Sequence, residues 1–218
     1  MPSKLIIAID GPAGSGKSTV AKILAKKLKV PYVDTGAMYR AATLGAMNAG
    51  IDFNKTGDLV IAAKKAKITF KGKRVFLNGR EVTKEIRTPE LTKNVFYIAQ
   101  EPLIRREMVK KQRAMGKKSG AVMEGRDIGT MVFPDADFKF FLEADPKVRA
   151  RRRYRELVQT GKRVRYSEVL KDLIRRDKSD KTRQEGPLRA AQDAFLIDTT
   201  SLTIDEVVDR ILARVAGD

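Results

Sequence analysis

Apolar residues recur along this chain in two patterns, as short uninterrupted runs and as longer stretches with helical spacing. The short runs predict buried strands at 5–9, 31–33, 121–124, 138–142 and 194–198. Helical spacing follows most of these runs, and the last helix opens at a capping box, Thr203 to Glu206. Strands that alternate with helices in this way predict an α/β protein whose parallel sheet carries helices on both faces.

The middle of the chain departs from that alternation. Residues 67–82 alternate in short stretches with turn signals at 71–73 and 78–79, which predicts an antiparallel meander of two or three strands. Residues 89–118 predict one or two helices broken at Pro102. We therefore expect this region to be an insertion outside the parallel sheet.

Three further helices are predicted between the remaining strands. One is predicted from Thr35 to about Asn48, where Gly50 stops it. A second opens at Asp145-Pro146 and is interrupted at Gly161, and a third runs from about Ser167 until Gly186-Pro187 stops it.

The chemistry begins directly after the first strand, where Gly11–Ser18 forms a complete G-x-x-x-x-G-K-[ST] phosphate-binding loop between a strand and a helix. The glycines let backbone N–H groups and a helix N-terminus point at anionic oxygens. Lys17 can reach the β- and γ-phosphates, and the Ser18 hydroxyl is placed to bind a nucleotide-bound Mg²⁺. A glycine turn that merely joins strand to helix would not account for Lys17-Ser18. The loop therefore predicts binding of a nucleoside triphosphate.

Composition narrows the class of protein. The sequence contains neither cysteine nor histidine, which excludes disulfides, thiol chemistry and imidazole catalysis. No apolar run is long enough to span a membrane, and the first one leads straight into the phosphate loop, so we expect a cytoplasmic protein.

Positive charge is in large excess, with 45 basic and 27 acidic residues giving +18. Much of the excess lies between Lys147 and Arg183. Three interpretations compete: phosphate neutralisation on a nucleic acid, a site that holds two polyanionic substrates side by side, and a highly charged heat-tolerant surface. The phosphate loop favours the second, with salt-sensitive binding to nucleic acid as a side effect.

Other motifs separate the classes of protein that use such a loop. A GTPase needs N-K-x-D and D-x-x-G, but residues 54–57 end in glycine and no D-x-x-G occurs. A motor ATPase usually carries an apolar strand that ends in Asp-Glu, of which 123–125 is only a weak echo. A small kinase remains, and a basic nucleic-acid-dependent ATPase is the rival from another class.

Three groups of arginines bear on the second substrate. Arg40, with Thr35 and Tyr39, follows the second strand beside the phosphate loop, which favours contact with a phosphate and a sugar. Gly125-Arg126-Asp127 follows the third strand at the same sheet edge; glycine alone would suit a simple turn, but an arginine next to an aspartate beside a nucleotide site favours function. The last group shares one helix face and is equally compatible with a substrate contact and with a solvated ion-pair face: Arg176, Asp180 and Arg183.

Along nearly its whole length the chain resembles the bacterial cytidylate kinases, members of the P-loop NTPase superfamily. The resemblance rests on the phosphate loop, DTGAMYR (34–40), EIRTPE (85–90), EGRDIGT (124–130), RRDKSDKTR (175–183) and the closing 195–208. It implies a five-stranded parallel core made by 1–50 and 119–218. It also implies an enlarged monophosphate-binding insertion at 51–118 and a helical lid at about 149–165.

The same resemblance implies transfer of the γ-phosphate of MgATP to CMP or dCMP. ATP would be cradled by Gly11, Pro12, Ala13, Gly14, Ser15, Gly16, Lys17, Ser18 and Thr19. The acceptor would be contacted by Thr35, Tyr39, Arg40, Arg105, Arg126, Asp127, Arg176 and Asp180, with Arg105 and Asp127 on the cytosine edge. Arg126 and Arg183 would hold phosphate, and the lid would contribute Arg149, Arg152 and Arg153.

One position departs from the family pattern. Many members have a serine that helps read the base where this chain has Phe96, so a neighbour such as Tyr97 substitutes or base selectivity is looser. The resemblance further implies a monomer whose partners are small nucleotides, with no specific nucleic acid and no membrane.

Overall fold

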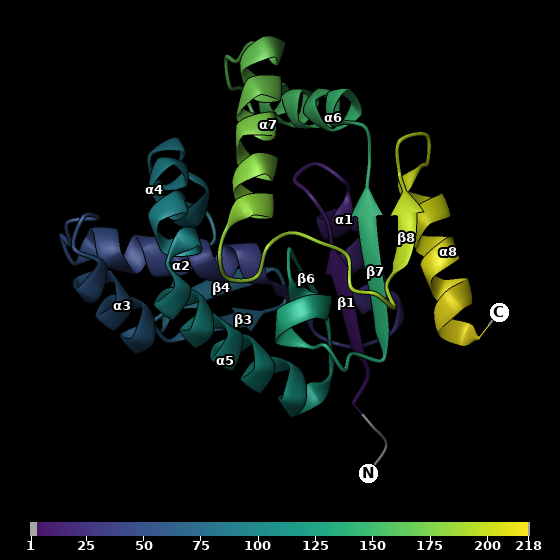
Figure 1. Cartoon of the computed structure of the whole chain (residues 1–218), viewed down its shortest axis with the longest axis horizontal. Helices are drawn as coiled ribbons and strands as arrows, with labels where there is room; N and C mark the ends of the chain where they lie inside the picture. Colours follow the sequence, from purple (N-terminus) through teal and green to yellow (C-terminus); the bar gives the residue numbers. More distant parts are fainter. Residues whose placement is uncertain (1–3, 218) are drawn as a thin grey trace.

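The computed structural model describes residues 4–217, and its centre is a parallel sheet that carries helices on both faces (Figure 1). The sheet has five strands in the order β2-β6-β1-β7-β8, all of them parallel. Their bounds are β1 (Ile6–Asp10), β2 (Tyr32–Asp34), β6 (Ala121–Gly125), β7 (Phe138–Glu143) and β8 (Phe195–Asp198). The strands predicted from the apolar runs are therefore confirmed, and so is the parallel α/β class.

The helices follow the strands as the periodicity predicts. Their bounds are α1 (Lys17–Lys27), α2 (Thr35–Asn48), α3 (Thr56–Lys65), α4 (Pro89–Gln100), α5 (Pro102–Ser119), α6 (Pro146–Gln159), α7 (Tyr166–Thr182) and α8 (Ile204–Ala216). Two short turns add η1 (Glu85–Arg87) and η2 (Ile128–Val132), the latter π-helical. Within residues 4–217 none of these helices is long and apolar enough to cross a membrane.

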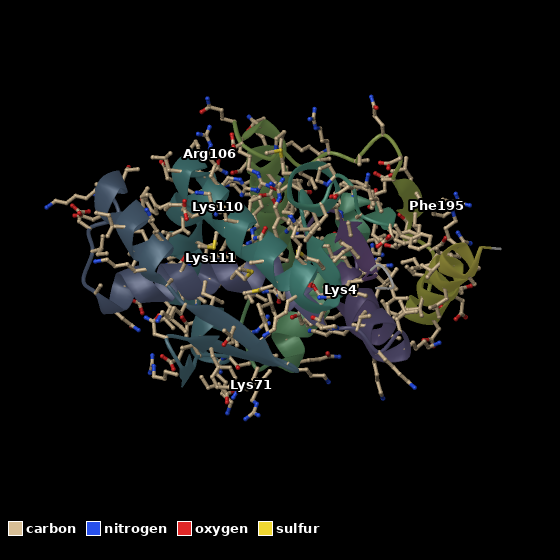
Figure 2. The ribbon with its side chains drawn as sticks, turned by 90° about the horizontal axis from the view of Figure 1, so that it is seen from below. Lys4, Lys71, Arg106, Lys110, Lys111 and Phe195 are labelled. Carbon is tan, nitrogen blue, oxygen red and sulfur yellow. The ribbon has the colours of Figure 1, made fainter. Side chains whose placement is uncertain are left out.

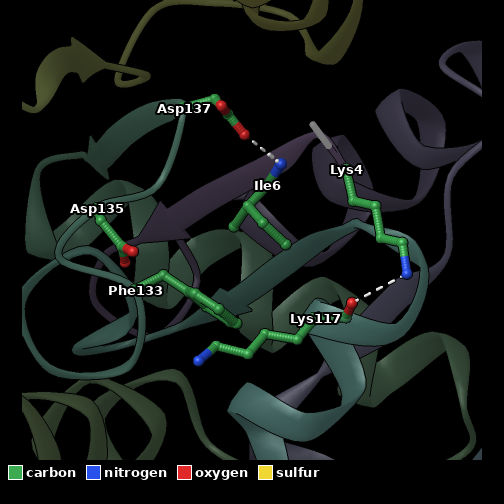
Figure 3. A pocket seen from close by; sticks show the side chains of 7 residues that line it. Lys4, Ile6, Lys117, Phe133, Asp135 and Asp137 are labelled. Carbon is green, nitrogen blue, oxygen red and sulfur yellow. Dashed lines mark hydrogen bonds between the residues drawn. The ribbon is translucent and has the colours of Figure 1, made fainter. Parts of the chain in front are cut away.

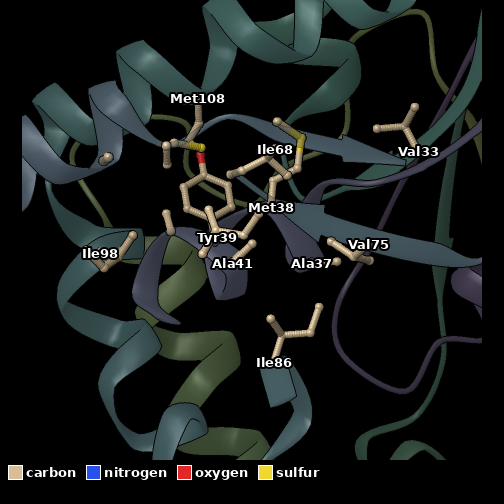
Figure 4. Close-up of a cluster of buried hydrophobic side chains, with 14 of the residues drawn as sticks. Val33, Ala37, Met38, Tyr39, Ala41, Ile68, Val75, Ile86, Ile98 and Met108 are labelled. Atoms are coloured by element: carbon tan, nitrogen blue, oxygen red, sulfur yellow. The ribbon is translucent and has the colours of Figure 1, made fainter. Parts of the chain in front are cut away.

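Strand β1 shows why both faces of the sheet are covered. Its five residues are all buried, as in a central parallel strand. Ile6 and Ala8 join the core under α2 and α5, whereas Ile7 and Ile9 join the core under α1 and α8. Figure 4 shows the first of these cores, in which side chains of α2 meet those of α4, α5 and the small sheet.

The insertion is a second structural layer beside the main sheet. Strands β3 (Ile68–Lys71), β4 (Arg74–Leu77) and β5 (Arg80–Glu81) form an antiparallel sheet of their own. The meander is therefore confirmed with three strands, and 89–118 forms two helices that meet at Pro102.

The sequence analysis does not predict α3, and α7 ends earlier than expected. Helix α3 has no side-chain cap at Lys55 and buries only Leu59 and Ala63, so neither a start signal nor a wide apolar stripe marks it. Helix α7 ends at Thr182, before Gly186, because Arg183 leaves the helical conformation and its Nε donates to the Gly186 carbonyl at 2.5 Å.

The register of the parallel strands shows which residues meet at the ligand-binding edge of the sheet. Asp10 pairs with Gly125 across β1 and β6, and Asp34 pairs with Glu124 across β2 and β6. The carboxyl ends of these three strands therefore coincide, and α6 and α7 lie above them in Figure 1. Open α/β sheets bind ligands at this edge.

Candidate active site

The loop between β1 and α1 has the conformation that phosphate binding needs. Gly11, Gly14 and Gly16 have φ values of 149°, 78° and 91°, which L side chains rarely adopt. A Cβ on Gly11 would lie 2.0 Å from the Leu142 carbonyl oxygen, so the loop packs directly on β7. The Ser15 hydroxyl is buried and has no hydrogen-bond partner among the described residues. A buried polar group of this kind suits a loop that binds an anion.

Lys17 starts α1 and is held inside this loop. Its Nζ donates to the Pro12 carbonyl at 3.0 Å, and the side chain is almost fully buried. Burial, helped by the positive charge of Arg126, lowers the pKa of Lys17 to about 7. Burial in the loop therefore disfavours the charged form of Lys17. A bound phosphate would favour that form again, because its negative charge raises the pKa of the ammonium group.

Glu124 connects the loop to β6 and was not among the predicted site residues. The Ser18 hydroxyl donates to its Oε2 at 2.7 Å, and the Thr35 hydroxyl donates to its backbone carbonyl, also at 2.7 Å. Its side chain is buried although it lies one residue before the end of β6, at the ligand edge of the sheet. The signal was present in the sequence, as the apolar run 121–123 that ends in a carboxylate, but it did not stand out from ordinary strand endings.

Asp10 holds the turn that follows β6. It accepts hydrogen bonds from the backbone N–H groups of Ile128 and Gly129, both at 2.8 Å. Burial raises the pKa of Asp10 to about 7, against the opposing effect of these two bonds. Because Asp127 directly precedes this turn, Asp10 helps to fix where the Asp127 carboxylate points.

A network of charged side chains faces the loop from α5, the β6–η2 connection and the end of α7. Arg105 pairs with Asp127, and Arg183 reaches the other oxygen of Asp127 at 3.5 Å. Arg183 also pairs with Asp180 at 3.3 Å, and Arg126 pairs with Asp180 at 2.8 Å. The sequence left Asp180 and Arg183 open between an ion-pair face and a site. The structure joins Asp180 to Arg126 and Arg183 to Asp127, so the neighbours Arg126 and Asp127 each pair with a residue from the end of α7.

The ion pairs of this network act against the cost of burying its charges. Asp180 illustrates the balance, because burial raises the pKa of its carboxyl but Arg126 and Arg183 outweigh that effect and lower it. Gly186 leaves room for the network, since a Cβ there would lie 2.1 Å from Asp127 Oδ2. Asp180 therefore stays ionised at neutral pH.

Tyr39 and Arg40 approach the same region from α2. The Arg105 guanidinium lies 5.3 Å from the centre of the Tyr39 ring, and burial raises the pKa of Tyr39 to about 12. Arg40 donates to the Ile86 carbonyl at 3.3 Å and to the Thr92 hydroxyl at 2.9 Å. Both side chains are thus fixed between α2 and the insertion. Arg176 lies one turn before Asp180 on α7.

The three arginines of α6 differ in their surroundings. Arg149 is buried at the base of the helix, where it donates to the Ala13 carbonyl of the phosphate loop at 3.1 Å and pairs with Asp177 at 2.7 Å. Arg152 donates to the hydroxyl of Thr199 at 3.0 Å. Arg153 pairs with Glu156 on its own helix at 2.7 Å.

Comparison with known proteins agrees with this geometry. The sequence model described as cytidylate kinase matches residues 7–216. The chain belongs to the cytidylate kinase family. The cytidylate kinase of Clostridioides difficile (strain 630) is 47% identical over 97% of this chain and 98% of its own length. That of Caldanaerobacter subterraneus subsp. tengcongensis is 51% identical over 96% of this chain and 93% of its own length.

A solved structure shows the fold independently. An uncharacterised protein from Eubacterium ventriosum ATCC 27560 superposes with a TM-score of 0.55 at 17% identity, covering 98% of this chain and 99% of that one. The overall fold of this cytidylate kinase family member is thus shared at low sequence identity.

Other features of this cytidylate kinase family member lie away from the strand ends. A pocket of about 320 Å³ occurs at the amino end of β1, where the Ile6 N–H donates to Asp137 and Lys4 donates to the Lys117 carbonyl (Figure 3). Seen from below, Arg106, Lys110 and Lys111 lie along α5, and Lys71 lies apart from them at the end of β3 (Figure 2). Positive charge is therefore also spread over surfaces remote from the phosphate loop.

Proposed function

We propose that this chain transfers the γ-phosphate of MgATP to CMP or dCMP, giving CDP or dCDP and ADP. The observation that carries the proposal is the meeting, at one sheet edge, of a phosphate loop with a buried lysine and a network that pairs three arginines with two aspartates. Membership of the cytidylate kinase family supports the choice of acceptor.

The roles we assign follow the arrangement of the side chains. Residues 11–19 cradle the ATP phosphates, and Lys17 acts on the transferring group together with Arg126 and Arg183. The acceptor phosphate and sugar are contacted by Thr35, Tyr39, Arg40, Arg126, Arg176 and Asp180. Arg105 and Asp127 present a donor and an acceptor to the base, which suits the edge of cytosine.

The chemistry needs charge compensation more than proton transfer. An oxygen of the acceptor phosphate forms the new bond to the γ-phosphorus as the bond to the β,γ-bridging oxygen breaks, and ADP leaves with that electron pair. The acceptor oxygen is already anionic near neutral pH, so a chain without histidine lacks nothing for this step. Lys17 and the arginines offset the repulsion between two polyanions and the charge that spreads over the transferring group.

The donor set at the loop fits a magnesium ion. A hydroxyl and a carboxylate, Ser18 and Glu124, lie together at the edge of the cradle, and hard oxygen donors of this kind suit Mg²⁺. We propose that Ser18 binds the ion and that Glu124 supports it. When bound with the nucleotide, the ion neutralises β- and γ-phosphate charge.

We further propose that residues 51–118 form the acceptor-binding part and that about 149–165 form a lid which excludes water. Arg149 and Arg152 would then belong to the base of that lid, where they touch the core. We also propose that the protein is a monomer, since every side chain assigned above comes from one chain, and that it is cytoplasmic.

An acceptor panel tests the proposal. ADP release from MgATP is followed with CMP, dCMP, UMP, AMP, GMP or no acceptor, and each product is identified by chromatography. We expect fast CDP and dCDP formation and little hydrolysis without acceptor. Comparable use of UMP would revise the substrate. Turnover that needs DNA or RNA instead of a monophosphate would refute the proposal.

Phe96 gives a prediction about base selectivity. Its side chain is 56% exposed on α4, one turn after Thr92, which contacts Arg40, and one turn before Gln100, which donates to Ser179 of α7. The ring thus lies on the side of α4 that borders the acceptor residues. We expect Phe96→Ser to raise the kcat/KM ratio of CMP over UMP by about tenfold, the value of one added hydrogen bond.

The matched control is Phe96→Ala, which removes the same ring without supplying a hydroxyl. Its CMP/UMP ratio should stay within about twofold of the parent, as measured with both acceptors at saturating ATP. Equal ratios in all three proteins would show that position 96 does not read the base.

A further inference from the structure

Tyr32 completes a chain of hydroxyl, carboxylate and hydroxyl groups that ends in the phosphate loop. Its phenol donates to Glu124 Oε1 at 2.5 Å, and Glu124 Oε2 accepts from the Ser18 hydroxyl at 2.7 Å. Tyr32 starts β2, outside the phosphate-loop motif and outside the groups that contact either nucleotide in the roles above. The question is what its hydroxyl does there.

The geometry constrains the carboxylate. Glu124 is only 3% exposed, and each of its oxygens accepts a hydrogen bond from a different element. The terminal torsion of a glutamate is intrinsically loose, so a partner on Oε1 is needed to fix where Oε2 points. The Tyr32 ring is held by packing against the core under α1, and the Lys22 ammonium lies 5.5 Å from its centre.

The direction of the hydrogen bonds decides what is left for an ion. Glu124 Oε2 takes the hydroxyl hydrogen of Ser18, which leaves the lone pairs of Ser18 Oγ free of that bond. The other oxygen, Glu124 Oε1, takes the phenol hydrogen of Tyr32, because a carboxylate has only acceptors to offer. Both hydroxyl groups therefore donate to Glu124, and the carboxylate lies between them.

We propose that Tyr32 is a positioning residue for the metal side of the nucleotide site. It holds Glu124 in the one orientation that keeps the Ser18 hydroxyl hydrogen bound and its oxygen available to a divalent cation. This inference rests on the proposed use of a metal–nucleotide complex. Groups that orient metal ligands in this indirect way typically change metal affinity or activity by about 10–100-fold when removed.

The test compares nucleotide binding with and without metal. Calorimetry gives the affinity for the non-hydrolysable analogue AMP-PNP in excess Mg²⁺ and in EDTA, and the ratio of the two measures the coupling between metal and nucleotide. Tyr32→Phe, which keeps the ring, should lower this ratio by about tenfold or more. Its affinity in EDTA should stay close to that of the parent, whereas its melting temperature should fall by roughly 2–10 °C, because one oxygen of the buried Glu124 carboxylate loses its donor.

Two further variants separate positioning from packing. Lys22→Ala removes the cation over the ring but keeps the phenol, and its Mg²⁺/EDTA ratio should equal that of the parent. Because Tyr32 acts through Glu124, adding Tyr32→Phe to Glu124→Gln should cause little further loss.

An unchanged ratio in Tyr32→Phe, or losses that add in full in the double variant, would overturn the proposal. These titrations contain no acceptor, so their outcome is separate from the acceptor panel. An enzyme with intact metal coupling that fails to phosphorylate CMP would contradict only the proposed function.

Discussion

Replacing Lys17 by methionine is expected to lower turnover with MgATP and CMP by a factor on the order of 10² to 10³, while the protein becomes more resistant to heat. The catalytic loss follows from the removal of an oriented positive charge in a water-poor loop, where such a charge stabilises the transferring phosphoryl group. Lys17 is held in that loop by Pro12, so no other side chain takes its place.

The gain in stability has the same origin. The pKa of Lys17 is lowered to about 7 in the folded chain because burial penalises its charge, from an ordinary value of 10.5. Below pH 7 the fold therefore carries the full cost of a buried ammonium, and this cost diminishes as the pH rises from 7 toward 10.5. Methionine, which is uncharged, removes this cost. In a chain of this size, each kcal/mol of added stability raises the melting temperature by roughly 2–4 °C.

Melting curves of parent and Lys17→Met between pH 6 and pH 10 test this argument. The variant should be more stable at pH 6, and the difference should shrink toward pH 10. A binding experiment provides the control: at pH 8 the parent should take up protons when ATP binds, as the phosphates raise the pKa of Lys17, and the variant should not. Near-parental kcat in the variant would contradict the assignment of Lys17.

Most of the fold could be predicted because its strands and helices carry local signals. Strand β1 is an apolar run, and α8 begins at a capping box that the structure confirms, with the Glu206 N–H bound to the Thr203 hydroxyl at 3.3 Å. Helix α3 escaped prediction because tertiary packing rather than capping supports it. The break at Pro102 was visible because proline cannot continue a helix.

The site was less predictable because its groups meet only in three dimensions. The phosphate loop is contiguous, so its motif reveals it. Arg105 and Asp127 come from α5 and from the turn after β6, and only the resemblance to a family suggested that they act together. Glu124 and Tyr32 were missed for the same reason, since nothing in the local sequence of β2 indicates a partner on β6.

The second large effect concerns Asp127, whose carboxylate is shared by two guanidinium groups. Arg105, Asp127 and Arg183 are 1%, 6% and 7% exposed, and both arginines pair with Asp127. Asp127→Ala leaves two buried cations without this partner. Removing one partner of a buried ion pair typically costs about 3–5 kcal/mol, which predicts a fall in melting temperature of roughly 6–20 °C.

The same substitution should remove the group that we assign to the base of the acceptor. Assayed well below its melting temperature, Asp127→Ala should lose at least about 10²-fold in kcat/KM for CMP, because a buried site that loses a hydrogen-bonding partner also leaves the base unpaired. Its KM for ATP should change little, since the hydrogen bonds that hold Lys17 and Ser18 of the phosphate loop do not involve Asp127. Asp127→Asn, which keeps one acceptor oxygen, should be intermediate in both measurements.

Glu185→Ala is the matched control for the stability argument. Glu185 pairs with Arg106 at 3.2 Å on the same side of the molecule, but that arginine side chain is 61% exposed. Water replaces a lost partner there, so we expect a change of at most about 1 kcal/mol and unaltered kinetics. If Asp127→Ala melted like Glu185→Ala, the two arginines would not depend on Asp127. If it kept its kcat/KM for CMP, Asp127 would stabilise the site without touching the acceptor, because burial alone sets the first effect and contact with substrate the second.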